Sequence, residues 1–211
     1  MKFLVSIFAL VGVLAAVTTF TAPSAIASTN TENSHSFWRY VDKSGDISRP
    51  SDQVVRNSWV HLGSWAIPDV KGASGPGIHE VYTQRWAVAV FNKTHKWPDG
   101  AVLVKQIHVI NKGARTTGQE VYWAGQTAVW FVMVRDNKNR FPKDPRWAHN
   151  WGWALFKADK PNKNISTQWD GKGLSNCKGC HIPATNTDYV YLEGYPVLDL
   201  TEEQKKLAAK H

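Results

Sequence analysis

The 211-residue sequence contains little sulfur, with only two cysteines and two methionines. No second cluster of cysteine and histidine accompanies Cys177 and Cys180, which excludes the ligand spacing of a structural zinc site. Internal repeats and long low-complexity tracts are absent, and after Phe20 no run is apolar enough to cross a bilayer. The lysines and arginines, although they give a net charge of +8, are scattered along the chain, which argues against nucleic-acid binding.

The one long apolar run lies at the start of the sequence. Lys2 is followed by uncharged residues from Phe3 to Phe20 and then by Ala25-Ile-Ala27. A short basic start, an apolar core and an A-x-A site are typical of a secretory signal peptide. A retained membrane anchor is the alternative, because a bilayer is spanned by roughly 20 apolar residues. We expect residues 1–27 to be removed and residues 28–211 to form one soluble domain in the periplasm.

The two cysteines lie in the segment Cys177-Lys-Gly-Cys-His181. C-x-x-C-H is the attachment site of c-type haem, in which each thiol bonds to the porphyrin and the adjacent imidazole binds the iron. The alternative is a redox dithiol with an incidental histidine, but the β-α-β context of such sites is missing. One motif predicts one haem c, attached through Cys177 and Cys180, with His181 as the axial ligand of its iron.

The ligand on the other side of the iron has no clear sequence signal. The mature chain has a single methionine, Met133, in the apolar run Ala128–Val134, which favours core packing over iron binding. Several histidines remain possible ligands, but none stands in a recognisable spacing. An open sixth position is therefore favoured, and an open iron binds small molecules. The histidines are His61, His79, His95, His108 and His149.

Most of the chain between polar turns has the composition of β-strands. The candidate strands are rich in valine, isoleucine and aromatic residues. Helices are expected over residues 51–62 and from Thr201 onward. The result is an α+β fold, mainly antiparallel sheet with a few packing helices, in one domain. Turns are expected at 71–77, 97–100 and 136–140, and strands at 80–91, 101–110, 120–134 and 151–156.

The strand from Ala101 to Ile110 contains a lysine among apolar residues. Alternation places residues 101, 103, 105, 107 and 109 on one face, and Lys105 is the only charged member of this set. An isolated buried ammonium is costly. Lys105 either reaches the sheet edge or a salt-bridge partner, or it is a functional amine whose pKa is lowered by burial.

Five segments, in order, resemble the cytochrome P-460 family, and together they span roughly residues 50–200. The first, Trp97-Pro-Asp-Gly-Ala-Val-Leu-Val-Lys105, resembles the family's F-x-D-G-T-x-x-x-K strand. The other four are residues 132–141, 151–156, 177–184 and 187–198.

The resemblance implies a homodimeric, mainly β c-type cytochrome with an open distal site. It also implies that Lys105 is cross-linked to the porphyrin rim and that the substrate is hydroxylamine, oxidised with nitric oxide towards nitrous oxide. The related cytochromes c′-beta lack the cross-link and bind nitric oxide or carbon monoxide, which keeps gas binding open as an alternative. A simple electron-transfer cytochrome is the third possibility.

One position departs from the family pattern. Where the best-known P-460 enzyme has a distal arginine, alignment through Glu80-Val-Tyr-Thr83 places Tyr82. Removal of protons from hydroxylamine requires a polar group near the iron, and Tyr82, His79 or Glu80 could supply it. The basic surface is either ordinary solvated loop or a guide for an acidic redox partner, which we expect to be another cytochrome.

Overall fold

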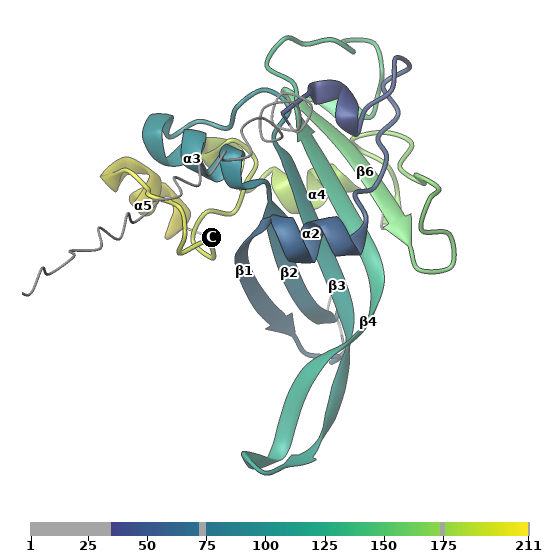
Figure 1. The fold of residues 1–211 in the computed structure, drawn as a ribbon, viewed down its shortest axis with the longest axis vertical. Coiled ribbons are helices and arrows are strands. Elements are labelled where there is room, and N and C mark those ends of the chain that lie inside the picture. Colours follow the sequence, from purple (N-terminus) through teal and green to yellow (C-terminus); the bar gives the residue numbers. More distant parts are fainter. Residues whose placement is uncertain (1–34, 72–74, 174–175, 211) are drawn as a thin grey trace, which may run out of the picture.

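A computed structural model describes residues 35–71, 75–173 and 176–210. Six strands form one antiparallel sheet in the order β1-β2-β3-β4-β6-β5 (Figure 1). This arrangement confirms the predicted α+β fold in one domain. The expected signal peptide, residues 1–27, lies outside the described residues. The strands are β1 Val60–Ile67, β2 Gly77–Thr83, β3 Val102–Arg115, β4 Gly118–Arg135, β5 Trp147–Ala148 and β6 Trp151–Lys157. The helices are η1 Phe37–Arg39, α2 Asp52–Ser58, α3 Arg85–Thr94, α4 Cys177–His181, η3 Thr185–Thr187 and α5 Glu202–Ala208.

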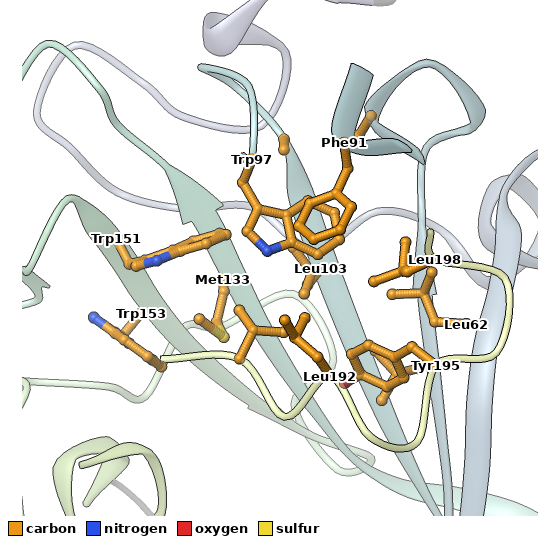
Figure 2. Packing of buried hydrophobic residues seen from close by; sticks show 14 of the residues in the cluster. Leu62, Phe91, Trp97, Leu103, Met133, Trp151, Trp153, Leu192, Tyr195 and Leu198 are labelled. Carbon is orange, nitrogen blue, oxygen red and sulfur yellow. The ribbon is translucent and has the colours of Figure 1, made fainter. Parts of the chain in front are cut away.

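Strand β3 lies between β2 and β4 and divides two buried clusters. Because side chains alternate along a strand, odd and even residues of β3 enter different clusters. The cavity-side cluster includes Leu62, Phe91, Trp97, Leu103, Met133, Trp151, Trp153, Leu192, Tyr195 and Leu198 (Figure 2). The helix-side cluster includes Val55, Trp59, Val102, Val104, Trp130, Val132, Val134 and Phe156.

The predicted alternation of this strand holds from Ala101 to Ile107. Lys105 lies opposite Val81 on β2 and Phe131 on β4, on the face of the cavity-side cluster. Val109, which was expected to share that burial, is 47% exposed. The reason is that β2 pairs with β3 only as far as His108, beyond which β3 and β4 continue as a projecting hairpin (Figure 1).

Helix α2 lies across the other face of the sheet (Figure 1). Ser51 caps its N-terminus by accepting a hydrogen bond from the Val54 backbone N–H. The next residue, Asp52, accepts from Gln106 Nε2 at 2.8 Å and from Trp130 Nε1 at 2.9 Å. One carboxylate thus ties the helix to β3 and β4.

Two element boundaries differ from the sequence-based expectation. The strand predicted over residues 80–91 ends at Thr83, and α3 follows it. Ala87 and Phe91, four residues apart, are both fully buried on one side of this helix, so tertiary packing overrides the strand propensity of the segment. The helix predicted over residues 51–62 ends at Ser58, because Leu62 is buried as part of strand β1.

The predicted turns and the C-terminal helix are observed where the described residues cover them. Gly100 has φ +80°, the left-handed conformation that favours glycine in the turn before β3. Thr201 and Gln204 form a capping box at the start of α5. Part of the expected loop at 71–77 lies outside the described residues.

The segment between η3 and α5 closes over the cavity-side face. Leu192, Tyr195 and Leu198 point from this segment into the cavity-side cluster beside Leu62 (Figure 2). The contact is tight, because a Cβ built on Gly63 of β1 would lie 1.8 Å from the carbonyl oxygen of Gly194. Only glycine at position 63 lets the two backbones approach this closely.

We predict that Gly63→Ala lowers the free energy of unfolding by about 1–3 kcal/mol, because the methyl group must push the closing segment away. Urea titration measures the effect. Gly194→Ala is the matched control: a Cβ there has no neighbour within 4 Å, so stability should be unchanged. Equal losses in both variants would contradict the described close approach.

Candidate cofactor site

A cavity of about 270 Å³ lies between the sheet, α4 and the closing segment. Its walls are mostly apolar, and no carboxylate belongs to the described residues that line it. Lys105, Cys177, Cys180 and His181, the four residues predicted from sequence to hold the cofactor, all line this cavity. A further polar residue, His79, lines it as well. The apolar wall residues include Trp65, Val81, Leu103, Ile107, Phe131, Met133, Trp153 and Val190.

Helix α4 is a single turn that presents the two thiols and the imidazole together. Asn176 caps it by accepting a hydrogen bond from the Gly179 N–H at 2.9 Å. Residues three and four apart lie on one side of a helix, so Cys180 and His181 share a face with Cys177. Cys177 is 6% exposed, whereas Cys180 is exposed. Burial raises the pKa of the Cys177 thiol to about 11.

The ring of His181 is held in one tautomer. Its Nδ1 lies 2.7 Å from the carbonyl oxygen of Tyr189, and a carbonyl only accepts, so Nδ1 carries the hydrogen. Burial lowers the pKa of His181 to about 4, which keeps the ring neutral at pH 7. A neutral imidazole oriented by a backbone carbonyl through one nitrogen offers the other as a metal ligand. The ring packs against Trp153 at 4.7 Å between centroids.

Lys105 enters the cavity from the sheet opposite α4. Its Nζ lies 4.6 Å from the centre of the Phe131 ring, and no salt bridge of the described residues includes it. Burial lowers its pKa, which raises the share of the uncharged, nucleophilic amine. Lys105 neither reaches a carboxylate of the described residues nor lies at the sheet edge, so neither of the structural contacts expected from the sequence is observed.

Tyr82 lies elsewhere, which corrects its expected place beside the distal site. It directly follows Val81, so alternation sends its side chain to the opposite face of the sheet. There its hydroxyl donates to Glu80 Oε2 at 2.9 Å, and the ring packs against the helix-side cluster. Burial raises the pKa of Tyr82 to about 12. Glu80 shares that face, where its Oε2 lies 3.0 Å from Nε2 of His108.

His79, which the sequence offered as a possible iron ligand or proton acceptor, lines the cavity. The signal that could have selected it is its parity with Val81, the partner of Lys105. Met133 is a buried member of the cavity-side cluster, as expected, and also forms part of the cavity wall. Of the other histidines considered as ligands, none borders the cavity within the described residues. They are His61, His95, His108 and His149.

The arrangement suits a flat, largely apolar group that carries iron. It combines two thiols on one helical turn, a neutral imidazole with a spare nitrogen, a lysine amine without a carboxylate partner, and aromatic walls. The thiols and the imidazole are the groups through which c-type haem is attached, and apolar walls suit the porphyrin ring.

Comparison with known families agrees with this chemistry. A model of the Cytochrome P460 family matches residues 55–192, a range that includes every polar residue of the cavity named above. The chain belongs to the cytochrome P460 family. Membership confirms the predicted family and implies a haem cofactor with iron. A search of curated proteins found no match.

We predict that the two thiols of the protein without haem react at different rates. At pH 8 a thiol with a pKa of about 11 is roughly one-thousandth thiolate, and Cys177 is also buried. Iodoacetamide should therefore label the exposed Cys180 at least about tenfold faster, as measured by peptide mass spectrometry. In urea-unfolded protein the difference should vanish. Equal labelling of the folded protein would contradict the buried position of Cys177.

Proposed function

We propose that this protein is a periplasmic cytochrome with one haem c that oxidises hydroxylamine, alone or with nitric oxide, to nitrous oxide. The observation that carries the proposal is the meeting of the Lys105 amine with Cys177, Cys180 and His181 in one cavity. Two hydroxylamine molecules give one nitrous oxide, one water, four protons and four electrons. With nitric oxide, one hydroxylamine gives one nitrous oxide, one water, one proton and one electron.

Three residues of α4 would each have a distinct part in holding the cofactor. Cys177 and Cys180 would form the two thioether bonds, and His181 would bind the iron through Nε2 while Nδ1 donates to Tyr189. Haem iron, when bound, supplies a one-electron acceptor with a coordination position for a small nitrogen compound. The apolar walls from Leu103, Ile107 and Phe131 exclude bulk water and admit a small uncharged molecule.

Lys105 would modify the electronic properties of the haem through a covalent bond from Nζ to the porphyrin edge. That bond replaces one N–H and one ring C–H, and the two protons and two electrons leave to an oxidant of the peroxide class. An uncharged amine is needed for it, and burial of Lys105 supports that state by lowering the pKa.

A second candidate function is the binding of nitric oxide or carbon monoxide without turnover, as in the cytochromes c′-beta. The predominantly apolar walls of the cavity support this alternative, because they provide few groups for proton transfer. A simple electron carrier is the third, in which Met133 of the cavity wall would bind the iron.

Export, assembly and electron transfer belong to the same proposal. We infer cleavage after Ala27 and a periplasmic location from the sequence of residues 1–27. In the part of the chain that the structure describes, no helix is long and apolar enough to cross a membrane. The family resemblance further suggests a homodimer that passes its electrons to another cytochrome.

The first test of the proposal is mass spectrometry of digested, natively matured protein. We expect one species whose mass equals the Lys105 peptide plus the haem-carrying Cys177–His181 peptide, less two hydrogens. Lys105→Met should remove this species, while Lys112→Met on the exposed hairpin should retain it. Thioether-bound haem without any lysine adduct in the wild type would favour the gas-binding alternative.

The second test is turnover. Matured protein with hydroxylamine and a chemical electron acceptor should release nitrous oxide, measured by gas chromatography. Lys105→Met should lower the rate by at least roughly tenfold, because the haem loses its modification, while carbon monoxide binding to the reduced protein persists. Gas binding without any nitrous oxide from the wild type would contradict the enzymatic proposal. Failure to bind carbon monoxide would indicate the electron carrier.

A further inference from the structure

His79 is a buried histidine in the cavity that has no part in attaching the cofactor. It is 4% exposed and lines the cavity from β2. On that strand it stands two residues from Val81, the partner of Lys105, so His79 and Lys105 are diagonal neighbours on one face of the sheet. On its other side it lies opposite Trp65 of β1, with the ring centroids 5.4 Å apart.

The hydrogen bonding of His79 fixes which nitrogen is basic. Nε2 lies 2.8 Å from the carbonyl oxygen of Gly75, so Nε2 carries the hydrogen and Nδ1 keeps a lone pair. Nδ1 is buried and has no hydrogen-bond partner among the described residues. A buried acceptor left unpaired is unfavourable, so such a group at a cavity points to a ligand that donates a hydrogen bond.

His79 and His181 enter the cavity from different parts of the molecule. His79 lies on β2, whereas His181 packs against Trp153 of β6, three strand positions away in the sheet. His79 thus enters from the sheet wall that also carries Lys105, whereas His181 enters from α4.

We propose that His79 is the proton acceptor of the cavity. This inference rests on the proposed function: Nδ1 takes a proton from an N–H or O–H group of hydroxylamine as that molecule is oxidised. The ring becomes an imidazolium that still donates from Nε2 to Gly75, and it then returns the proton to solvent. The electrons pass to ferric iron and on to an external acceptor cytochrome. The Gly75 carbonyl orients the His79 ring through Nε2, in the way that a hydrogen bond to one ring nitrogen orients catalytic histidines in general.

The charged and titratable surroundings favour a neutral base. Burial lowers the pKa of His79, and the nearby Lys105 and His108 lower it further. Strand β1 contributes only Trp65 and Ile67 to the cavity, neither of which titrates. The pKa of His79 therefore lies below its usual value, and the proton-accepting form predominates at neutral pH. The other titratable groups lining the cavity are Cys177, Cys180, His181, Tyr191 and Tyr195.

The test compares His79→Gln with His61→Gln. Glutamine at position 79 retains an N–H donor for Gly75 but cannot accept a proton as readily as an imidazole. His61 is an exposed histidine on the neighbouring strand, with its ring beside Tyr82 outside the cavity, and so provides a matched control. Both variants are prepared as the matured haem protein.

The decisive reaction is the binding of hydrogen cyanide to the ferric protein, which requires a base to remove the proton as cyanide binds. We expect His79→Gln to bind it roughly 10²–10⁴-fold more slowly than the wild type and His61→Gln at the wild-type rate. Carbon monoxide binding to the ferrous protein involves no proton, so its rate should be the same in all three proteins. In His79→Gln the rate of nitrous oxide formation should fall together with the rate of cyanide binding.

Two results would overturn the inference. One is an unchanged cyanide rate in His79→Gln. The other is a wild-type protein that binds neither gas nor cyanide until His79 is replaced, which would make His79 an iron ligand. If no protein forms nitrous oxide but the cyanide rates differ as expected, the inference stands and only the proposed substrate is wrong.

A measurement on the wild type covers the case in which His79→Gln does not fold. Exchange of the imidazole C2 hydrogen, followed by peptide mass spectrometry over a pH series, reports the titration of each histidine. We expect the midpoint for His79 to lie below 6.5. A midpoint above neutral pH would leave most of the His79 rings protonated under working conditions and would overturn the inference.

Discussion

Burial of both faces of β3 is the constraint on which the rest of the structure depends. From Val102 to His108, before the strand enters the projecting hairpin, each residue points to one of two covered sides, and alternation decides which. Gln106 goes to the helix side and donates to Asp52, which holds α2 in place. The side chain of Lys105, one residue earlier, enters the cavity, where no carboxylate belongs to the described lining residues. The alternation of the strand therefore places both the Gln106 amide that contacts α2 and the Lys105 amine that enters the cavity.

The absence of carboxylates from the described lining of the cavity determines the charge state of its other groups. Without a negative partner, burial favours the uncharged forms, so His79 and His181 are neutral imidazoles and Lys105 tends towards a free amine. Backbone carbonyls then select the tautomers, through Gly75 for His79 and through Tyr189 for His181. Each imidazole keeps one nitrogen with a lone pair.

Local sequence was sufficient for the features that depend on a few adjacent residues. The turn at Gly100 and the alternation around Lys105 could both be predicted this way, and the C-x-x-C-H motif of Cys177–His181 is visible in the sequence itself. Features that depend on distant contacts could not. Helix α3 has a strand-like composition and is helical because Phe91 packs into the cavity-side cluster. Tyr82 was expected beside the distal site, but it lies one residue after Val81 and so points to the opposite face from Val81 and Lys105.

The position of α4 along the chain has a consequence for biogenesis. All six strands precede Cys177 in the sequence, and η3, the closing segment and α5 follow it. A chain made from its N-terminus therefore contains the strands that carry His79 and Lys105 before Cys177, Cys180 and His181 are synthesised. Attachment of a porphyrin through these residues, as proposed, would come only after all the strands that surround the cavity have been made.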